Sequence, residues 1–106
     1  MTATMTRTDT QVEVLVYGHE AVVTPAGDLD FGTERVVDKV LTALAGLDVH
    51  VTVDLAQVEF VDSWTVALMQ RAGCDVTESG RTFQLVDATP FVRQIFSLLG
   101  ADYLFA

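Results

Sequence analysis

Residues 49–55, Val-His-Val-Thr-Val-Asp-Leu, alternate apolar and polar side chains without a break, which is the period of a β-strand. On either side of this segment the apolar residues recur with helical spacing instead, over residues 34–45 and about residues 63–79. A strand between two helices is joined to its neighbours by right-handed crossovers, which connect parallel strands. This order constrains the architecture more than any other feature of the chain, and it predicts an α/β fold.

A β-hairpin is predicted ahead of these segments. Residues 12–17 and 21–25 are rich in β-forming side chains and are separated by the turn-forming residues 18–20. Pro25 lacks an amide donor, so we expect it to close the second strand and not to lie centrally in a ladder. Residues 26–33, Ala-Gly-Asp-Leu-Asp-Phe-Gly-Thr, are then expected to form a loop because of their Gly and Asp content.

The helices carry recognisable end signals. Thr33 is a candidate N-cap for residues 34–45, and Gly46 is a candidate stop in the position after the helix. The central helix is expected to end at Gly80. A strand over residues 82–87 precedes the last helix, whose end signals are Thr89 as N-cap, Pro90 in the first position and Gly100 as the stop. The apolar face predicted for this last helix consists of Phe91, Val92, Ile95, Phe96 and Leu99.

The predicted architecture is a single α/β domain with a mixed β-sheet, in the order β-β-α-β-α-β-α, flanked by helices. The 106 residues, half of them hydrophobic, suffice for one core and one domain. We assign residues 11–106 to this domain and residues 1–10, which are polar and rich in Thr, to a flexible N-terminal tail. No apolar run approaches the length that spans a bilayer, and the tail lacks a signal-peptide core, so we expect a cytoplasmic protein.

Composition excludes several classes of function. The formal net charge is -9, with one Lys and five scattered Arg, whereas nucleic acids and anionic membranes require basic clusters. A single Cys, Cys74, excludes an internal disulfide, and with two His the chain has no zinc-binding spacing. We therefore expect no cofactor or metal, no nucleic-acid partner and no membrane partner.

The only Trp of the chain, Trp64, lies at the beginning of the predicted central helix, at the end of the segment Phe-Val-Asp-Ser-Trp. On a helical wheel the buried stripe of this helix consists of Val66, Met69, Ala72, Gly73 and Val76. Trp64 projects on the opposite, polar side, and Leu68 one turn later extends it into an apolar spot. We interpret Trp64 as an exposed anchor for a protein partner, since exposed Trp side chains are typical interface hot spots. Folding over a neighbouring loop and stacking on a ligand are the alternatives.

Asp62 and Ser63, which precede Trp64, allow two interpretations. Both residue types are favoured N-caps, because their side chains accept hydrogen bonds from the free amides of a first helical turn. Ser63 could instead accept a phosphate, which the amides and dipole of a helix N-terminus would stabilise. A phosphate next to Asp62 would abolish a docking surface through repulsion and desolvation.

Three motifs of this chain resemble the STAS domain of anti-sigma factor antagonists. They are Gly-Asp-Leu-Asp at residues 27–30, Asp-Leu-Ala-Gln-Val-Glu-Phe-Val-Asp-Ser at residues 54–63, and Val-Arg-Gln-Ile-Phe-Ser-Leu-Leu-Gly at residues 92–100. The resemblance covers about residues 12–105, and the second motif is the most specific. It implies a STAS-like fold and a domain that binds an anti-sigma factor, itself a serine/threonine kinase, until phosphorylation at the start of the helix ends binding.

The chain departs from this family at the position that the resemblance marks as the phosphate acceptor. That position follows the Asp-Ser pair, and here it holds Trp64, which has no hydroxyl; the next family position, a Gly, is Thr65. Ser63 or Thr65 could act as a shifted acceptor, although each points about 100° away around the helix. We expect a domain that docks without the usual phosphoregulation.

The predicted function is a non-catalytic interaction domain that binds a kinase-like anti-sigma factor or a related regulator. The sequence leaves open whether the domain also forms a homodimer. The residues predicted to bind the partner are Asp28, Asp30, Asp62, Ser63, Trp64, Thr65 and Leu68. A small-ligand-sensing STAS module is the alternative function. An enzyme that uses magnesium is disfavoured: acidic residues near strand ends (Asp28, Asp30, Asp54, Asp62 and Asp87) could hold the ion, but no suitably placed Lys accompanies them.

Overall fold

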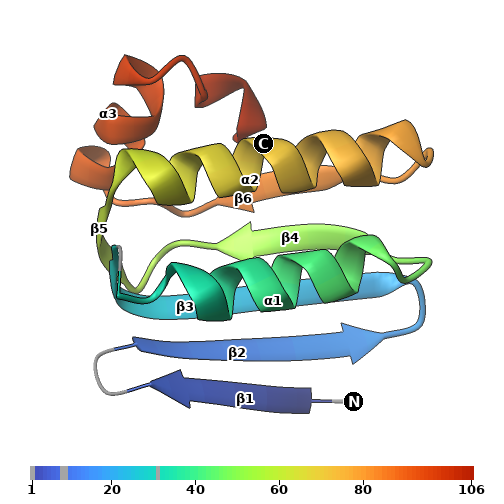
Figure 1. Cartoon of the computed structure of the whole chain (residues 1–106). Helices are drawn as coiled ribbons and strands as arrows, with labels where there is room; N and C mark the ends of the chain where they lie inside the picture. Colours follow the sequence, from blue (N-terminus) through green and yellow to red (C-terminus); the bar gives the residue numbers. More distant parts are fainter. Residues whose placement is uncertain (1, 8–9, 31) are drawn as a thin grey trace.

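The computed structural model describes residues 2–7, 10–30 and 32–106 and confirms the predicted α/β fold, a mixed sheet flanked by helices (Figure 1). The strands are β1 (Thr2–Arg7), β2 (Thr10–Tyr17), β3 (Glu20–Leu29), β4 (His50–Asp54), β5 (Val58–Val61) and β6 (Phe83–Val86). The helices are α1 (Glu34–Ala45), α2 (Ser63–Glu78), α3 (Pro90–Leu98) and a short C-terminal 3-10 turn, η1 (Asp102–Leu104).

The sheet is antiparallel at its N-terminal side and parallel beyond β3. Its strand order is β1-β2-β3-β4-β6, and β5 pairs with β3 outside this path. The strands β4, β5 and β6 all run parallel to their neighbours, as the crossovers through α1 and α2 predict. The carboxyl ends of β3, β4, β5 and β6 therefore lie at the same end of the sheet.

Pro25 lies inside β3, contrary to the expectation that it closes the strand. On one side β3 pairs continuously with β2, and on the other it pairs with β4 through residues 20–23 and with β5 through residues 27–29. The amide of Gly27 donates to the carbonyl of Gln57 in the turn before β5, at 3.0 Å. Pro25, two residues earlier, has its nitrogen on that same side, at the gap between the two partner strands. The missing amide donor therefore interrupts no ladder.

Residues 1–10 were predicted to form a flexible tail, but part of this segment is a strand. Residues 2–7 form β1, which pairs antiparallel with β2 in a continuous register from Thr2–Leu15 to Arg7–Thr10. Residues 1, 8 and 9 lie outside the described residues. Ala3 and Met5 alternate with Thr2, Thr4 and Thr6, which is the period of a strand, but the segment was interpreted as a tail because it is polar and rich in Thr.

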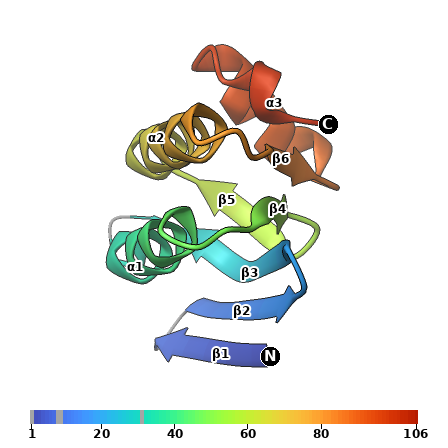
Figure 2. The same ribbon diagram turned by 90° about the vertical axis from the view of Figure 1, so that its right-hand side faces the viewer.

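Helices α1 and α2 lie side by side on one face of the sheet, and α3 lies at the opposite end of the sheet from β1 (Figure 2). The core fills the space between the sheet and the helices, and its largest fully buried side chains include Phe96, Leu29, Leu55, Met69 and Leu85. The predicted buried stripe of α2 is confirmed, since Val66, Met69, Ala72, Gly73 and Val76 are all buried. Burial of these apolar faces is the main favourable term for such a domain.

Helix ends agree only in part with the predicted signals. Thr89 caps α3 through its hydroxyl, which accepts from the amide of Val92 at 3.3 Å, and Gly100 adopts the left-handed conformation after the helix. Thr33 precedes α1, but its hydroxyl makes no capping bond to the helix. Helix α1 ends before Gly46, as predicted, and Gly46 is its C-cap with φ of -84°, outside the left-handed region.

Candidate functional site

The candidate site forms where the ends of β3 and β5 meet the first turn of α2. Residues 27–29 of the Gly-Asp-Leu-Asp segment continue β3 and pair with β5, so the first part of the loop predicted for residues 26–33 is a strand instead. The carbonyl of Leu29 accepts from the amide of Asp62 at 3.0 Å and from the hydroxyl of Thr65 at 3.1 Å. These two hydrogen bonds fix the beginning of α2 directly against the end of β3.

Asp62 is the N-cap of α2, which confirms the capping interpretation for this residue. Its carboxylate Oδ1 accepts from the amide of Thr65 at 2.8 Å, and its backbone is extended. Ser63 is the first helical residue, and its side chain is exposed. Of the two polar residues before Trp64, only Asp62 therefore acts as the side-chain cap.

Thr65 is fully buried, with 0% of its surface exposed. Its hydroxyl points back to β3 and donates to the carbonyl of Leu29. The sequence placed this residue among those that bind a partner, and the structure places it beneath the surface, where it positions the helix.

Trp64 has 61% of its surface exposed, which confirms that its side chain points away from the sheet. It is the only residue of the first turn of α2 that presents a large apolar side chain to the surface. Beside it, Ala67, Leu68 and Arg71 line a shallow and largely apolar hollow. An exposed fraction this large argues against the alternative in which the indole is folded down over a neighbouring loop.

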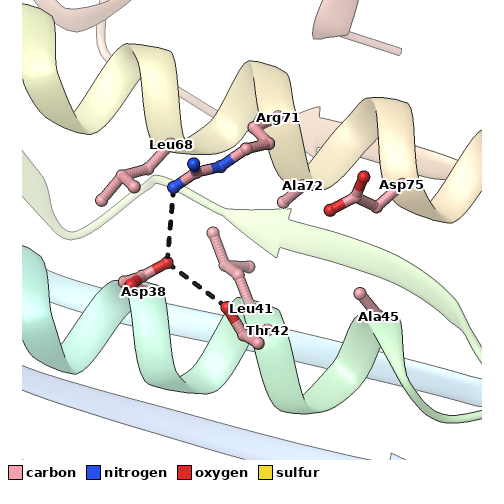
Figure 3. Close-up of a pocket in the computed structure, with 8 residues that line it drawn as sticks. All are labelled: Asp38, Leu41, Thr42, Ala45, Leu68, Arg71, Ala72 and Asp75. Carbon is pink, nitrogen blue, oxygen red and sulfur yellow. Dashed lines mark hydrogen bonds and ion pairs between the residues drawn. The ribbon is translucent and has the colours of Figure 1, made fainter.

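Leu68, predicted to extend the apolar spot around Trp64, lines the hollow beside Trp64 but adds little exposed surface to it. Only 9% of its surface is exposed. Leu68 faces α1 and lines what we term the α1–α2 groove, whose lining residues are Asp38, Leu41, Thr42, Ala45, Leu68, Arg71, Ala72 and Asp75 (Figure 3). A wheel of α2 alone could not reveal this burial, because the covering surface comes from α1.

An ion pair spans the α1–α2 groove. The guanidinium of Arg71 lies 4.0 Å from the carboxylate of Asp38, which also accepts a hydrogen bond from the hydroxyl of Thr42 at 3.3 Å (Figure 3). Both charged side chains are more than half exposed, so the pair contributes little to stability. The pair matters for the charge of the groove, because Arg71, the basic residue that lines it, is already paired with Asp38.

Asp28 and Asp30 lie at the end of β3, near the start of α2, as predicted. The carboxylate of Asp30 accepts from the amide of Gly32 at 3.1 Å, and the backbone carbonyls of both Asp residues accept from the hydroxyl of Thr33. The same hydroxyl accepts from the amide of Asp30 at 3.0 Å. Thr33 thus orders the turn between β3 and α1, which explains why it makes no capping bond to α1.

Two exposed aromatic side chains near this end of the sheet were missed as site residues. Phe60 in β5 and Phe91 in the first turn of α3 are both exposed, and their ring centroids are 6.5 Å apart. Phe91 had been assigned to the buried face of α3, as had Leu99, which is exposed as well. Phe91 directly follows Pro90, the first residue of α3, and this place in the first turn of the helix was the sequence signal that its side chain could be exposed.

The acidic residues near the strand ends do not form a metal-binding cluster. No group of three or more His, Cys, Asp or Glu side chains among residues 2–7, 10–30 and 32–106 could hold a metal ion. The carboxylate of Asp54 instead accepts from the amide of Ala56 at 2.9 Å, which is a local turn. Cys74 is exposed, and its pKa is raised by a hydrogen bond to Glu78 and by the charge of that carboxylate, which disfavours a reactive thiolate.

None of the helices in the described part of the chain has the length and apolar character needed to cross a membrane.

Comparison with protein families gives a match over most of the chain. Residues 16–106 match the family model described as "Mlab, STAS domain". A comparison with curated protein sequences gave no significant match.

Solved structures of low sequence identity share the fold. The anti-sigma factor antagonist SpoIIAA in its unphosphorylated form is 19% identical, with a TM-score of 0.78 over 90% of this chain and 85% of that one. An anti-sigma factor antagonist from Mycobacterium paratuberculosis is 21% identical, with a TM-score of 0.75 over 99% of this chain and 83% of that one. A part of the murine Slc26a9 anion transporter is 20% identical, with a TM-score of 0.67 over 79% of this chain and 14% of the transporter.

Proposed function

Because this chain belongs to the STAS domain family, we propose that it is a cytoplasmic, non-catalytic interaction domain of the anti-sigma factor antagonist type. The family match over residues 16–106 and the fold shared with such antagonists support this type of function. The partner proposed is an anti-sigma factor of the serine/threonine kinase type, bound at the start of α2. The observation that carries the proposal is the exposure of Trp64 on that first turn.

The surroundings of Trp64 suit a docking anchor. Its side chain is exposed, while the backbone beneath it is held by the hydrogen bonds of Asp62 and Thr65 to Leu29. A large apolar side chain on a rigid support loses little conformational entropy on binding, which favours affinity. The exposed pair of Phe60 and Phe91 near the same end of the sheet offers further apolar surface. We therefore place the partner contact on Trp64 and not on the buried Thr65 and Leu68.

Replacing Trp64 with Ala tests the anchor. We expect the variant to fold normally, because the side chain is exposed, and to bind the partner more weakly by about 2 kcal/mol, roughly thirtyfold in Kd. The partner is first captured from native cell extract with the wild-type domain, and its affinity is then measured by calorimetry. Tyr103→Ala is the matched control, since Tyr103 is an equally exposed aromatic side chain on η1. Equal affinity of wild type and Trp64→Ala would refute the anchor.

We also propose that this domain lacks the usual phosphoregulation. Trp64 stands at the position that the family resemblance marks as the phosphate acceptor, and Thr65 is buried with its hydroxyl bonded to Leu29. Ser63 is exposed, but it points in a different direction around the helix from the acceptor position. None of the three side chains therefore offers a hydroxyl in the place where a family kinase would meet one.

Incubation with the captured kinase-type partner and ATP, followed by phosphopeptide mass spectrometry, tests this second proposal. We expect no phosphate on the wild-type segment of residues 62–65. The variant Trp64→Ser restores a hydroxyl at the acceptor position and is expected to become phosphorylated, which shows that the kinase is active. Stoichiometric phosphate on Ser63 of the wild type would show instead that the acceptor has shifted by one residue.

A further inference from the structure

A further hollow lies on the side of α2 that faces the C-terminal segment, whereas α1 lies on its other side (Figure 1, Figure 2). We term it the α2–η1 pocket, and its lining residues are Gln70, Gly73, Cys74, Thr77, Phe83, Tyr103 and Leu104. Its volume is about 390 Å³, within the range of roughly 300–1,000 Å³ that is typical of small-molecule sites. The pocket shares no lining residue with the α1–α2 groove or with the hollow beside Trp64. It is therefore separate from the proposed docking surface.

The inner part of the pocket is apolar and depends on a glycine. Gly73, Phe83 and Leu104 are buried. A Cβ atom on Gly73 would lie 3.1 Å from side-chain carbons of both Leu104 and Phe83, which is closer than an ordinary van der Waals contact. The missing side chain therefore lets η1 and β6 pack closely against α2. Phe83 and Tyr103 add aromatic surface, which pairs favourably with the rings of a ligand.

One polar group that lines the pocket is available to a ligand. The side chain of Gln70 is half-buried, and its amide makes no hydrogen bond to any residue in the described part of the chain. The neighbouring polar side chains differ: the hydroxyl of Thr77 donates to the carbonyl of Gly73 at 2.8 Å, and the thiol of Cys74 donates to the carboxylate of Glu78 at 3.3 Å. An amide both donates and accepts, so Gln70 suits a neutral polar group on a ligand.

The charge of the pocket distinguishes it from the other hollows on α2. The α1–α2 groove and the hollow beside Trp64 both include Arg71, whereas none of the described residues that line the α2–η1 pocket is charged. The carboxylate of Glu78, which accepts from Cys74, lies outside the lining. An ion buried in the pocket would therefore lose hydration without gaining a partner of opposite charge among the lining residues. These surroundings favour an uncharged ligand, although the chain has a net charge of -9.

We propose that the α2–η1 pocket binds an uncharged aromatic small molecule that carries a polar group. The rings of the ligand pack against the apolar inner part of the pocket, and its polar group forms a hydrogen bond with the amide of Gln70. Small-molecule sites in proteins combine an apolar lining with a few polar groups in the same way. This binding function goes beyond the docking of a protein partner and does not depend on it.

Two dyes with the same aromatic framework test the proposal. 1-Anilinonaphthalene is uncharged, and 1-anilinonaphthalene-8-sulfonate carries a sulfonate in addition. We expect the uncharged dye to bind in a saturable way, measured by its fluorescence, and the sulfonate dye to bind much more weakly. Cys74 reports the place of binding, because it is the only Cys and its exposed thiol can be alkylated by N-ethylmaleimide. At about ten times the Kd of the uncharged dye, the alkylation rate should fall roughly tenfold, since only the unoccupied protein reacts.

The matched control combines Cys74→Ser with Ala67→Cys, which moves the thiol to an exposed position of the same helix, in the hollow beside Trp64. The uncharged dye should leave the alkylation rate of this variant unchanged. Equal protection of both thiols would show that the dye coats the surface in general, and the proposed site would be wrong. A lack of saturable binding, or equal protection of Cys74 by the sulfonate dye, would also overturn it. The docking function is tested separately, by the affinity of Trp64→Ala for the captured partner.

Discussion

At the scale of single residues, Trp64 and Thr65 show how adjacent side chains on a helix acquire opposite roles. Trp64 is exposed, whereas Thr65 is buried and bonded to the carbonyl of Leu29. They are separated by about 100° around the axis of α2, and only one of these directions meets the sheet. The direction of Trp64 followed from the sequence, because the apolar stripe of α2 defines where the core lies. The partner of the Thr65 hydroxyl is a residue 36 positions earlier, so no local pattern could identify it.

Replacing Thr65 with Val should lower the free energy of unfolding by about 1 kcal/mol. Val has nearly the same shape, so the loss reports the buried hydroxyl; the Leu29 carbonyl keeps the Asp62 amide as a donor, which limits the cost. Urea denaturation measures the change. Thr24→Val, at a half-buried position in β3, is the control and should not destabilise the domain, because Val suits a strand at least as well as Thr. If both variants lose the same free energy of unfolding, the loss in Thr65→Val reflects the Thr-to-Val change in general and not the hydrogen bond to Leu29.

At the scale of elements, the helices were predicted better than the short strands. The bounds of α1 were predicted to the residue, and those of α2 to within one residue, because apolar periodicity and capping residues are local signals. Strand β5 was not predicted as an element, since only four residues form it and its two central side chains are exposed. It becomes a strand because β4 pairs only with residues 20–23 of β3, which leaves residues 27–29 of β3 free to pair with β5.

The C-terminus of α1 depends on a side chain from elsewhere in the chain. The last turn of α1 contains no basic residue, and the guanidinium of Arg81, before β6, donates to the carbonyls of Leu44, Ala45, Leu47 and Val49, at 2.7 Å for Ala45. These donors replace the hydrogen bonds that the end of a helix leaves unmade and complement its dipole. Arg81 thus connects the end of α1, the turn into β4 and the beginning of β6.

Replacing Arg81 with Met should therefore destabilise the domain by about 2 kcal/mol, since several carbonyls lose a charged donor together. Amide hydrogen exchange should speed up first in the last turn of α1. Arg35→Met, which alters an exposed residue of the same helix, is the comparison and is expected to change stability by less than about 0.5 kcal/mol. Unaltered exchange at the end of α1 in Arg81→Met would contradict the proposed capping role.

At the scale of the whole molecule, the domain divides into a helix-covered sheet and an N-terminal edge. Strand β1 pairs with β2 alone, while α1, α2 and α3 pack against later strands (Figure 2). The STAS family match begins at residue 16, near the end of β2. The N-terminal strand is therefore an edge strand that only β2 holds in the sheet.

Deletion of residues 1–9 should leave a folded domain with a single cooperative thermal transition and a modestly lower Tm. The reason is that the core, among residues whose burial the structure describes, draws on β2 to β6 and the three helices. Circular dichroism gives the transition, and a two-dimensional NMR spectrum compares signals of α2 with those of the full chain. Loss of the cooperative transition would show that β1 is required for folding of the sheet.

The sequence by itself determined the α/β class, the extent of α1 and α2, the cap Thr89, and the outward direction of Trp64, whereas the choice of Asp62 over Ser63 as the cap of α2 came from the structure. These features depend on residues within one or two helical turns of one another, where spacing and hydrogen-bonding side chains act directly. The tertiary structure decided the pairing of β1 and β5, the burial of Leu68 against α1, the hydroxyl contact of Thr65 and the capping of α1 by Arg81. Each of these involves groups brought together only when separate elements pack, and the free energy of such contacts depends on the partner surface rather than on the local pattern.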